Sequence, residues 1–225
     1  MTQLIDTFFN LPIILQSLPL LLQGLWLTVA LTLVALPVSA LAGLLLACLG
    51  EAPSRTARLL SRAHVDVFRA MPPLVLLVFL FYALPLVGLG LPQFLAATLS
   101  MVLNGSAYFA EVFRAGLEAV PRGQREAARS LGMSWTVATL LVVVPPAVRH
   151  VLPDLLGNAI ELFKLTAIAS AVSMQDLLRS AQISQGLTFN PSPLTAAALI
   201  YVAIAWPLVR WMSNAQRRDL PPHVR

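Results

Sequence analysis

The sequence predicts an all-α, polytopic membrane protein with about five transmembrane helices and one short helix on the cytoplasmic face. Hydrophobic residues make up 58% of the 225 residues and charged residues only 11%, whereas a soluble domain usually has about 25% charged residues. Long uncharged runs alternate with short arginine-rich segments. Each run is expected to form a helix, because an isolated strand leaves its backbone polar groups unpaired in lipid.

The first uncharged run lies between Asp6 and Glu51. Within it, Leu18–Leu49 is long enough to cross a bilayer, which needs about 20 apolar residues. Pro37 and Gly43 are tolerated in membrane helices. The first 54 residues contain no Lys or Arg, so the basic segment of a cleavable signal peptide is missing. We therefore expect a genuine membrane span here.

The second uncharged run, between Arg69 and Glu111, is too long for one span. Turn-forming residues divide it near its middle: Pro85, Gly88, Gly90 and Pro92. We predict two spans, about Met71–Val87 and Gln93–Ala110, joined by a tight turn.

A charged segment follows, and two further spans are expected after it. The apolar stretch VATLLVVVPPAV is too short to cross a bilayer, and Pro145–Pro146 is expected to interrupt it. The fourth span is predicted at about Leu155–Val172 and the fifth at about Leu194–Val209. A polar tail ends the chain.

Arginine placement predicts the orientation. Arginines cluster in the loop at 51–69, in the segment 114–149 and in the tail from 210, including Arg225. The segment before the first span and the loop near residue 90 have none, and the loop at 173–193 has one. Because cytoplasmic loops carry an excess of Lys and Arg, we expect the N-terminus outside and the C-terminus in the cytoplasm. In a membrane protein the net charge of +5 is therefore explained without a nucleic-acid partner.

The short charged segment GQREAARSLG, residues 123–132, predicts a helix at 122–131. Pro121 suits its first turn, Gly132 suits a left-handed cap, and Ser134 suits the N-cap of a following helix. Four residues share one face: Gln124, Ala127, Ala128 and Leu131. Glu126 can pair with Arg122 or Arg129. This pattern fits a docking helix or an ordinary surface helix equally well.

The same segment carries a resemblance to a known family. EAARSLGMSWTVATLLVVVP resembles the EAA loop of ABC-transporter permeases, with Val142–Pro145 in place of the usual I-x-L-P. The similarity to polar amino-acid importer permeases extends over about residues 16–215. Three further stretches resemble that family: LPLLLQGLWLTVALTLVALPVSALAG at 18–43, VDVFRAMPPLVLLVFLFYALP at 65–85, and NGSAYFAEVFRAGLEAVPRGQREAARSLG at 104–132.

The resemblance implies a type I ABC importer permease-like fold, in which 1–225 form a single transmembrane permease domain of the bacterial cytoplasmic membrane. The segment at about 114–135 would be the cytoplasmic coupling segment. The residues implied to contact an ATPase are Gly123, Gln124, Glu126, Ala127, Ala128, Leu131 and Gly132. The implied partners are a cytoplasmic ABC ATPase dimer, a second copy or a homologous permease, and an extracytoplasmic amino-acid-binding protein.

Polar residues inside the expected spans are candidates for a substrate path, because an unpaired charge in lipid is costly. Asp154, Asn158 and Glu161 share a face, and Lys164 can pair with Glu161. The candidates are Asn104, Tyr108, Glu111, Asn158, Glu161 and Lys164. Helix packing through hydrogen bonds and a structural ion pair is the alternative. The family's usual K-D-T-S-L is replaced by Lys164–Ile168, which lacks the Asp and the Ser.

Catalytic and metal-binding patterns are missing from the sequence. Cys48 is the only cysteine, and the three histidines are scattered. No G-x-x-x-x-G-K-[ST] occurs, so ATP and its magnesium are expected on the partner ATPase, with no cofactor or metal on this chain. We predict a non-enzymatic permease subunit of an ATP-driven amino-acid importer. An ion-coupled secondary transporter or channel is the alternative.

Overall fold

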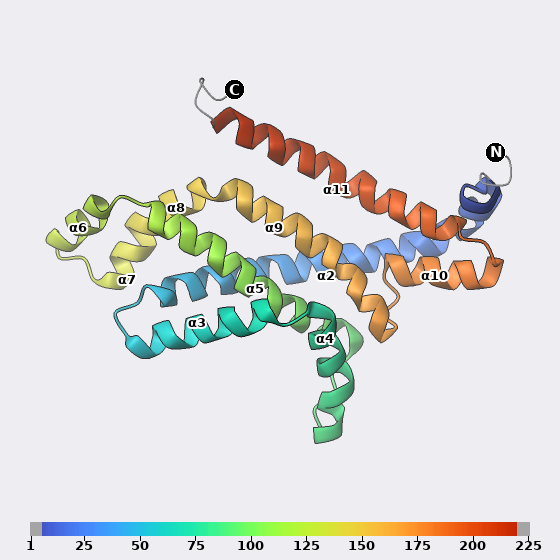
Figure 1. The fold of residues 1–225 in the computed structure, drawn as a ribbon, viewed down its shortest axis with the longest axis horizontal. Coiled ribbons are helices and arrows are strands. Elements are labelled where there is room, and N and C mark those ends of the chain that lie inside the picture. The colour runs from blue at the N-terminus through green and yellow to red at the C-terminus, as the bar shows by residue number, and fades with distance from the viewer. Residues whose placement is uncertain (1–5, 220–225) are drawn as a thin grey trace. The chain divides into compact units, whose positions relative to one another are not determined.

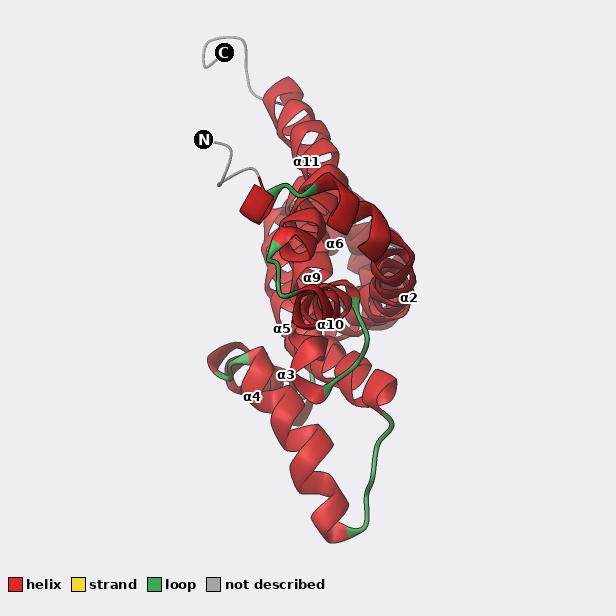
Figure 2. Ribbon diagram, turned by 90° about the vertical axis from the view of Figure 1, so that its right-hand side faces the viewer, coloured by secondary structure: helices red, strands yellow, loops and turns green. Residues whose placement is uncertain are grey.

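The computed structural model describes the backbone of residues 6–219 and the side chains of 6–213, and within these limits it contains helices and turns without strands (Figure 1, Figure 2). Its residues form two compact units. The first comprises 6–35, 73–101 and 160–219 of the described chain, and the second 36–72 and 102–159. Arg225, which contributed to the predicted orientation, lies outside the described residues. The all-α prediction is confirmed.

In the first unit, the N-terminal part of α2 (Leu11–Gly50) packs against α10 (Leu177–Thr188) and α11 (Ser192–Asp219). Their shared core contains Leu21, Leu177, Ala181, Ala196 and Ala197. The backbone N–H of Leu177 donates to Thr28 Oγ1 at 3.0 Å, and the Ser17 and Ser184 hydroxyls are 2.5 Å apart. Hydroxyl groups therefore join α2 to α10 alongside apolar packing.

The second span of the prediction is helical but not a regular α-helix. It consists of α4 (Pro73–Val78), the π-helical segment η1 (Phe79–Ala83) and the 3₁₀ segment η2 (Leu84–Val87). Pro85 lacks an N–H, so the regular hydrogen-bond ladder cannot continue through it. Gly88 then takes a left-handed conformation with φ +83° and ends the segment. The turn predicted between the second and third spans is present.

The second unit contains the C-terminal part of α2, α3 (Arg55–Ala70), most of α5 (Gln93–Ala119), α6 (Arg122–Ser130) and the chain up to residue 159. After α6 come α7 (Trp135–Ala138), the π-helical segment η3 (Thr139–Val143), α8 (Val144–His150) and α9 (Leu152–Leu165). Two glycines permit close helix contacts. Gly43 of α2 lies against Phe109 of α5, and Gly116 of α5 lies against the carbonyl of Ala147 on α8.

Three local predictions were wrong. The loop predicted at 51–69 contains most of α3, whose N-cap Ser54 accepts a hydrogen bond from the N–H of Ala57. Pro145–Pro146 do not interrupt a helix, because they lie in the first turn of α8. The backbone N–H that proline lacks has no partner within the helix at that position. The loop predicted at 173–193 contains α10.

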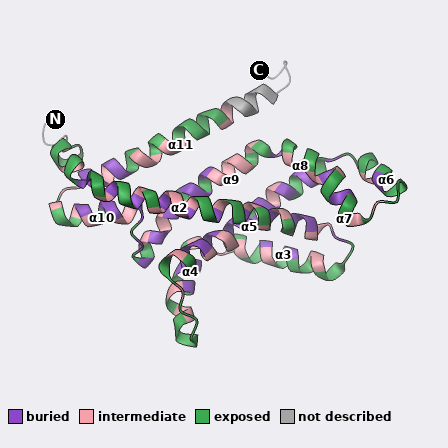
Figure 3. Cartoon of the chain, turned by 180° about the vertical axis from the view of Figure 1, so that it is seen from behind, coloured by how far each residue is buried: buried purple, intermediate pink, exposed green. Residues whose placement is uncertain are grey.

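Within the described part of the chain, three helices are long and apolar enough to cross a membrane: Asp6–Gly50, Leu152–Val172 and Ser192–Ser213. A fourth is obtained if Arg55–Ala70 and Pro73–Val87 together form one broken span. The predicted span Gln93–Ala110 lies within α5 but is not among the helices apolar enough to cross a membrane. Polar residues such as Ser100 and Asn104 lower its mean hydropathy. Figure 3 shows many exposed residues along α2 and α11. Large hydrophobic side chains are common among them, such as Trp26, Leu41 and Trp206.

Candidate functional site

The local structure of α6 follows from its flanking residues. The helix extends over Arg122–Ser130, one residue shorter than predicted, with Pro121 immediately before it. Gly132 has φ +79°, and its N–H donates to the Arg129 carbonyl at 2.9 Å. Ser134 then accepts a hydrogen bond from the N–H of Val137 and caps α7. The left-handed glycine and the serine cap are both confirmed.

The exposed surface of α6 differs from the predicted face. Ala128 is 3% exposed, and α6 packs against η3. The other coupling candidates are exposed: Gly123, Gln124, Glu126, Ala127, Leu131 and Gly132. The two alanines therefore point in different directions, since Ala128 contacts its own chain and Ala127 remains accessible.

Arg125 holds α6 to the rest of the second unit. Its guanidinium donates two hydrogen bonds to the Glu51 carboxylate, at 2.6 and 3.2 Å, and one to the Leu117 carbonyl at 2.6 Å. No local pattern predicts this ion pair, because its partners are 74 residues apart in the sequence. The predicted pairing of Glu126 with Arg122 or Arg129 is wrong, since Glu126 forms no ion pair among the described residues.

A cavity of about 340 Å³ lies behind α6. Its lining includes Glu51, Arg58, Arg125, Arg129 and Trp135. Arg58 donates to the carbonyls of Ala52 and Pro53, at 2.7 and 2.8 Å. Arg58 and Arg125 therefore both form hydrogen bonds with other groups of this chain.

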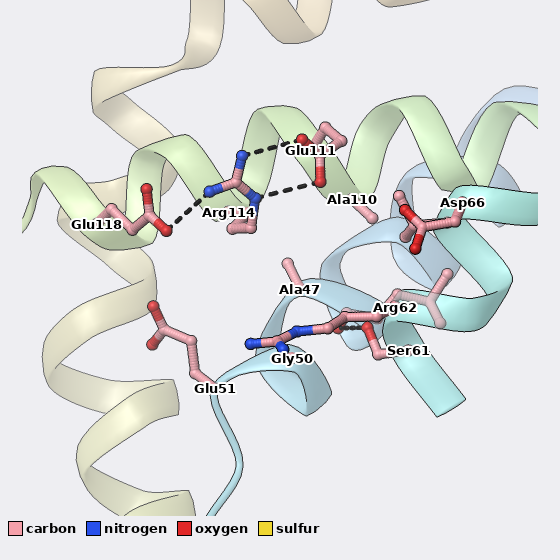
Figure 4. Close-up of a pocket in the computed structure, with 12 residues that line it drawn as sticks. Ala47, Gly50, Glu51, Ser61, Arg62, Asp66, Ala110, Glu111, Arg114 and Glu118 are labelled. Atoms are coloured by element: carbon pink, nitrogen blue, oxygen red, sulfur yellow. Dashed lines mark hydrogen bonds and ion pairs between the residues drawn. The ribbon is translucent and has the colours of Figure 1, made fainter. Parts of the chain in front are cut away.

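A second cavity, of about 130 Å³, lies among α2, α3 and α5 (Figure 4). Figure 4 shows Arg114 on α5 between two carboxylates of the same helix. It donates to Glu111 at 2.9 and 3.1 Å and to Glu118 at 2.7 Å. This hydrogen bonding lowers the pKa of Glu111 and raises that of Arg114. Arg69 of α3 also reaches Glu111, at 3.4 Å.

Three substrate-path candidates lie where α5 meets the C-terminal end of α3. Asn104 is buried, and its amide donates to the Phe68 carbonyl at 2.7 Å. Tyr108 is 44% exposed, and the Arg69 guanidinium carbon lies 5.7 Å from its ring centre. Glu111 pairs with Arg69 and Arg114. All three have partners that join α3 to α5 or stabilise α5 itself.

The other three candidates lie on α9. The buried Nδ2 atom of Asn158 has no hydrogen-bond partner within the described chain. Lys164 pairs with Glu161 at 2.5 Å, as predicted, but the side chains are 50% and 70% exposed. Asn158 belongs to the second unit and the ion pair to the first. The ion pair lies on the surface of this chain, within a helix apolar enough to span a membrane.

The chain is similar to known transport proteins. Residues 39–218 match the family model of the binding-protein-dependent transport system inner membrane component. A putative glutamine transport system permease protein of Rickettsia conorii is 33% identical, over 80% of this chain and 84% of its own length. The arginine transport system permease protein ArtQ of Bacillus subtilis is 30% identical, over 92% of this chain and 94% of its own length.

Solved structures share the fold. The structure of an amino acid ABC transporter with histidines has a TM-score of 0.81 and 35% identity, covering 91% of this chain and 96% of that one. An inward-facing structure of the methionine ABC transporter MetNI has a TM-score of 0.73 at 20% identity, covering 90% and 97%. At that identity the methionine transporter supports the fold alone. Since the family model covers most of the chain, this protein belongs to the family of inner-membrane components of binding-protein-dependent transport systems, as a permease subunit.

Proposed function

We propose that this chain is the permease subunit of an ATP-driven importer of polar amino acids, and that α6 is its coupling helix. The observation that carries the proposal is the geometry of α6. It is a short, charged helix with Gly123, Glu126 and Ala127 on its exposed surface, and Arg125 holds it to α2 and α5. A helix exposed on one side and fixed on the other suits the transmission of force.

The amino-acid substrate class is supported by the relatives. The permease proteins of Rickettsia and Bacillus are named for glutamine and arginine transport, and the structure with 35% identity is an amino acid transporter. Such substrates carry both a carboxylate and an ammonium group. A path for them needs groups of both signs, and the exposed Glu161–Lys164 pair offers them in a helix long enough to span the bilayer.

The partners follow from the subunit type. We propose that two permease subunits enclose the path, that two cytoplasmic ATPase subunits bind ATP and magnesium, and that an extracytoplasmic binding protein delivers the substrate. The N-terminus then lies outside the bacterial cytoplasmic membrane and α6 inside, as the arginine distribution favours. Nucleotide-driven movement of the ATPases would rock the spans by hinge or shear motion.

Copurification with the ATPase tests this function. Glu126→Arg reverses the one acidic charge on the exposed surface of α6, so we expect tagged permease to lose its ATPase partner. Asp66→Arg is the matched control, because Asp66 is also exposed and the charge change is identical. The control should retain the ATPase. Unchanged copurification and transport by the Glu126→Arg protein would refute the assignment of α6.

A further inference from the structure

We propose that Arg125 is a positioning residue that fixes the coupling helix to the ends of α2 and α5, so that ATPase-driven movement of α6 reaches both helices. This inference rests on the proposed function of α6 and adds the residue that carries its motion. Arg125 itself faces inward, away from the surface expected to contact an ATPase, and acts through Glu51 and the Leu117 carbonyl.

The contacts of Arg125 join three segments at one guanidinium. Both Glu51 oxygens and the Leu117 carbonyl oxygen accept hydrogen bonds from it, at 2.6, 3.2 and 2.6 Å. The Arg125 side chain is 33% exposed and that of Glu51 19%. A planar guanidinium that binds a carboxylate through two hydrogen bonds fixes orientation as well as distance. A rotation of α6 would therefore move its partners or break the ion pair.

Among the charged side chains of α6, Arg125 is the one that forms an ion pair with another helix or turn of the described chain. Arg122, Glu126 and Arg129 are exposed and form no ion pair in the described part of the chain. Ala128, one turn from Arg125, is buried but has only a methyl group with which to hold its neighbours. The polar attachment of α6 to α2 and α5 is thus concentrated at Arg125.

Glu51 lies beside two cavities and precedes a turn that Arg58 holds through hydrogen bonds. Glu51 lines both the 130 Å³ and the 340 Å³ cavities, so little tight packing supports it there. Arg58, in contrast, donates to the carbonyls of Ala52 and Pro53 and fixes the turn that follows Glu51. The carboxylate therefore follows a turn that Arg58 holds, and the ion pair with Arg125, rather than close packing, links it to α6.

The test is the transport-to-ATP ratio of the complete complex, with ATPase and binding protein, in proteoliposomes. For Arg125→Met we expect the ATPase to copurify and to hydrolyse ATP, while amino acid transported per ATP falls about five-fold, the lower end of typical coupling between sites. The matched control is Arg149→Met, because Arg149 is exposed and forms no ion pair among the described residues. Its ratio should equal that of the unmodified complex.

Two double variants separate transmission from stability. Arg125→Met leaves the Glu51 charge half-buried and unpaired, which destabilises a fold by itself. Glu51→Gln with Arg125→Met removes that charge, so its melting temperature should recover while the ratio stays low. Glu51→Arg with Arg125→Glu restores an ion pair but not the bond to the Leu117 carbonyl, because a carboxylate cannot donate. This variant should therefore raise the ratio in part. Recovery of the ratio in the uncharged pair, or a normal ratio in Arg125→Met alone, would overturn the inference.

The inference and the proposed function fail differently. If Glu126→Arg releases the ATPase and Arg125→Met has a normal ratio, α6 is the docking helix and Arg125 does not transmit its motion. If Glu126→Arg leaves both copurification and transport intact, the function proposed for α6 is wrong, and the inference about Arg125 is overturned with it.

Discussion

At the scale of single residues, Asp176 is a buried acid whose two carboxylate oxygens differ. Its Oδ1 caps a helix, and its Oδ2 has no hydrogen-bond partner among the described atoms. It is the N-cap of α10, where its Oδ1 accepts a hydrogen bond from the Arg179 N–H at 2.9 Å. The residue is 0% exposed, and its Oδ2 has no partner among the described atoms. Burial raises the pKa of Asp176 to about 6, and the hydrogen bond from Arg179 opposes the rise.

This raised pKa predicts a pH dependence of stability. Because the folded-state pKa lies above the ordinary 3.8, the folded protein binds the proton more tightly than the unfolded chain does. The stabilisation is complete below pH 4 and is lost as pH rises through about 6, by about 2 to 3 kcal/mol in all. Asp176→Asn keeps the capping oxygen and removes the titration. We expect its melting temperature in detergent to vary less between pH 4.5 and 7.5 and to exceed that of the unmodified protein at pH 7.5.

The control for this prediction is Asp66→Asn, an exposed acid that forms no ion pair in the described chain. It should leave the pH dependence of the melting temperature unchanged. If Asp176→Asn has the same pH slope as the unmodified protein, the carboxylate is charged in the folded state across this range and burial does not dominate its titration.

At the scale of elements, the crossing of α2 and α5 depends on Gly43. A Cβ placed on it would lie 2.5 Å from the Phe109 Cβ and 2.9 Å from the Ala110 nitrogen. Both contacts are far inside van der Waals distance, so Gly43→Ala must separate the helices. We expect the free energy of unfolding to fall by about 2 kcal/mol, measured by denaturation in detergent.

The matched control for the helix crossing is Gly186→Ala. Gly186 lies within α10, and a Cβ there would meet nothing within 4 Å. Because alanine is the better helix former, this variant should be neutral or more stable by about 0.5 to 1 kcal/mol. Equal stability of Gly43→Ala and the unmodified protein would show that α2 and α5 do not cross so closely.

The elements that could be predicted from the sequence are those whose signals are local. The left-handed Gly132 and the cap Ser134 bound α6 within a few residues of it, and both predictions hold. For α3 the cap Ser54 was a local signal of the same kind, but its arginines were interpreted as a loop between spans. The π-helical segments η1 and η3 could not be predicted, because such a shift in hydrogen bonding depends on packing as well as on the prolines beside them.

The candidate site was predictable to a smaller extent, because its contacts are distant in sequence. The coupling candidates were found from a contiguous motif, and six of the seven are exposed. The burial of Ala128 depends on η3, and the Arg125–Glu51 ion pair joins residues 74 positions apart. Helical periodicity places residues on faces but does not indicate which face contacts the rest of the chain.

At the scale of the whole molecule, the fold supplies long helices and a surface that this chain alone leaves apolar. Three helices, α2, α5 and α9, contribute residues to both compact units. Large side chains such as Trp26, Leu33 and Leu41 are more than 60% exposed on α2. Apolar exposure on this scale is that expected of a subunit covered by lipid or by a second permease. Under the proposed function, the force that moves these helices enters at α6.

Thiol cross-linking from α6 to the ATPase within the assembled transporter tests that claim most directly. Cys48 is buried and is the only cysteine, so a Cys48→Ala background makes the reaction specific. We predict that Ala127→Cys forms a cross-link with the ATPase subunit, whereas Ala128→Cys, at a position 3% exposed, does not. If Ala127→Cys cross-links with no ATPase in any nucleotide state, or reacts only within the permease, α6 is not the coupling helix.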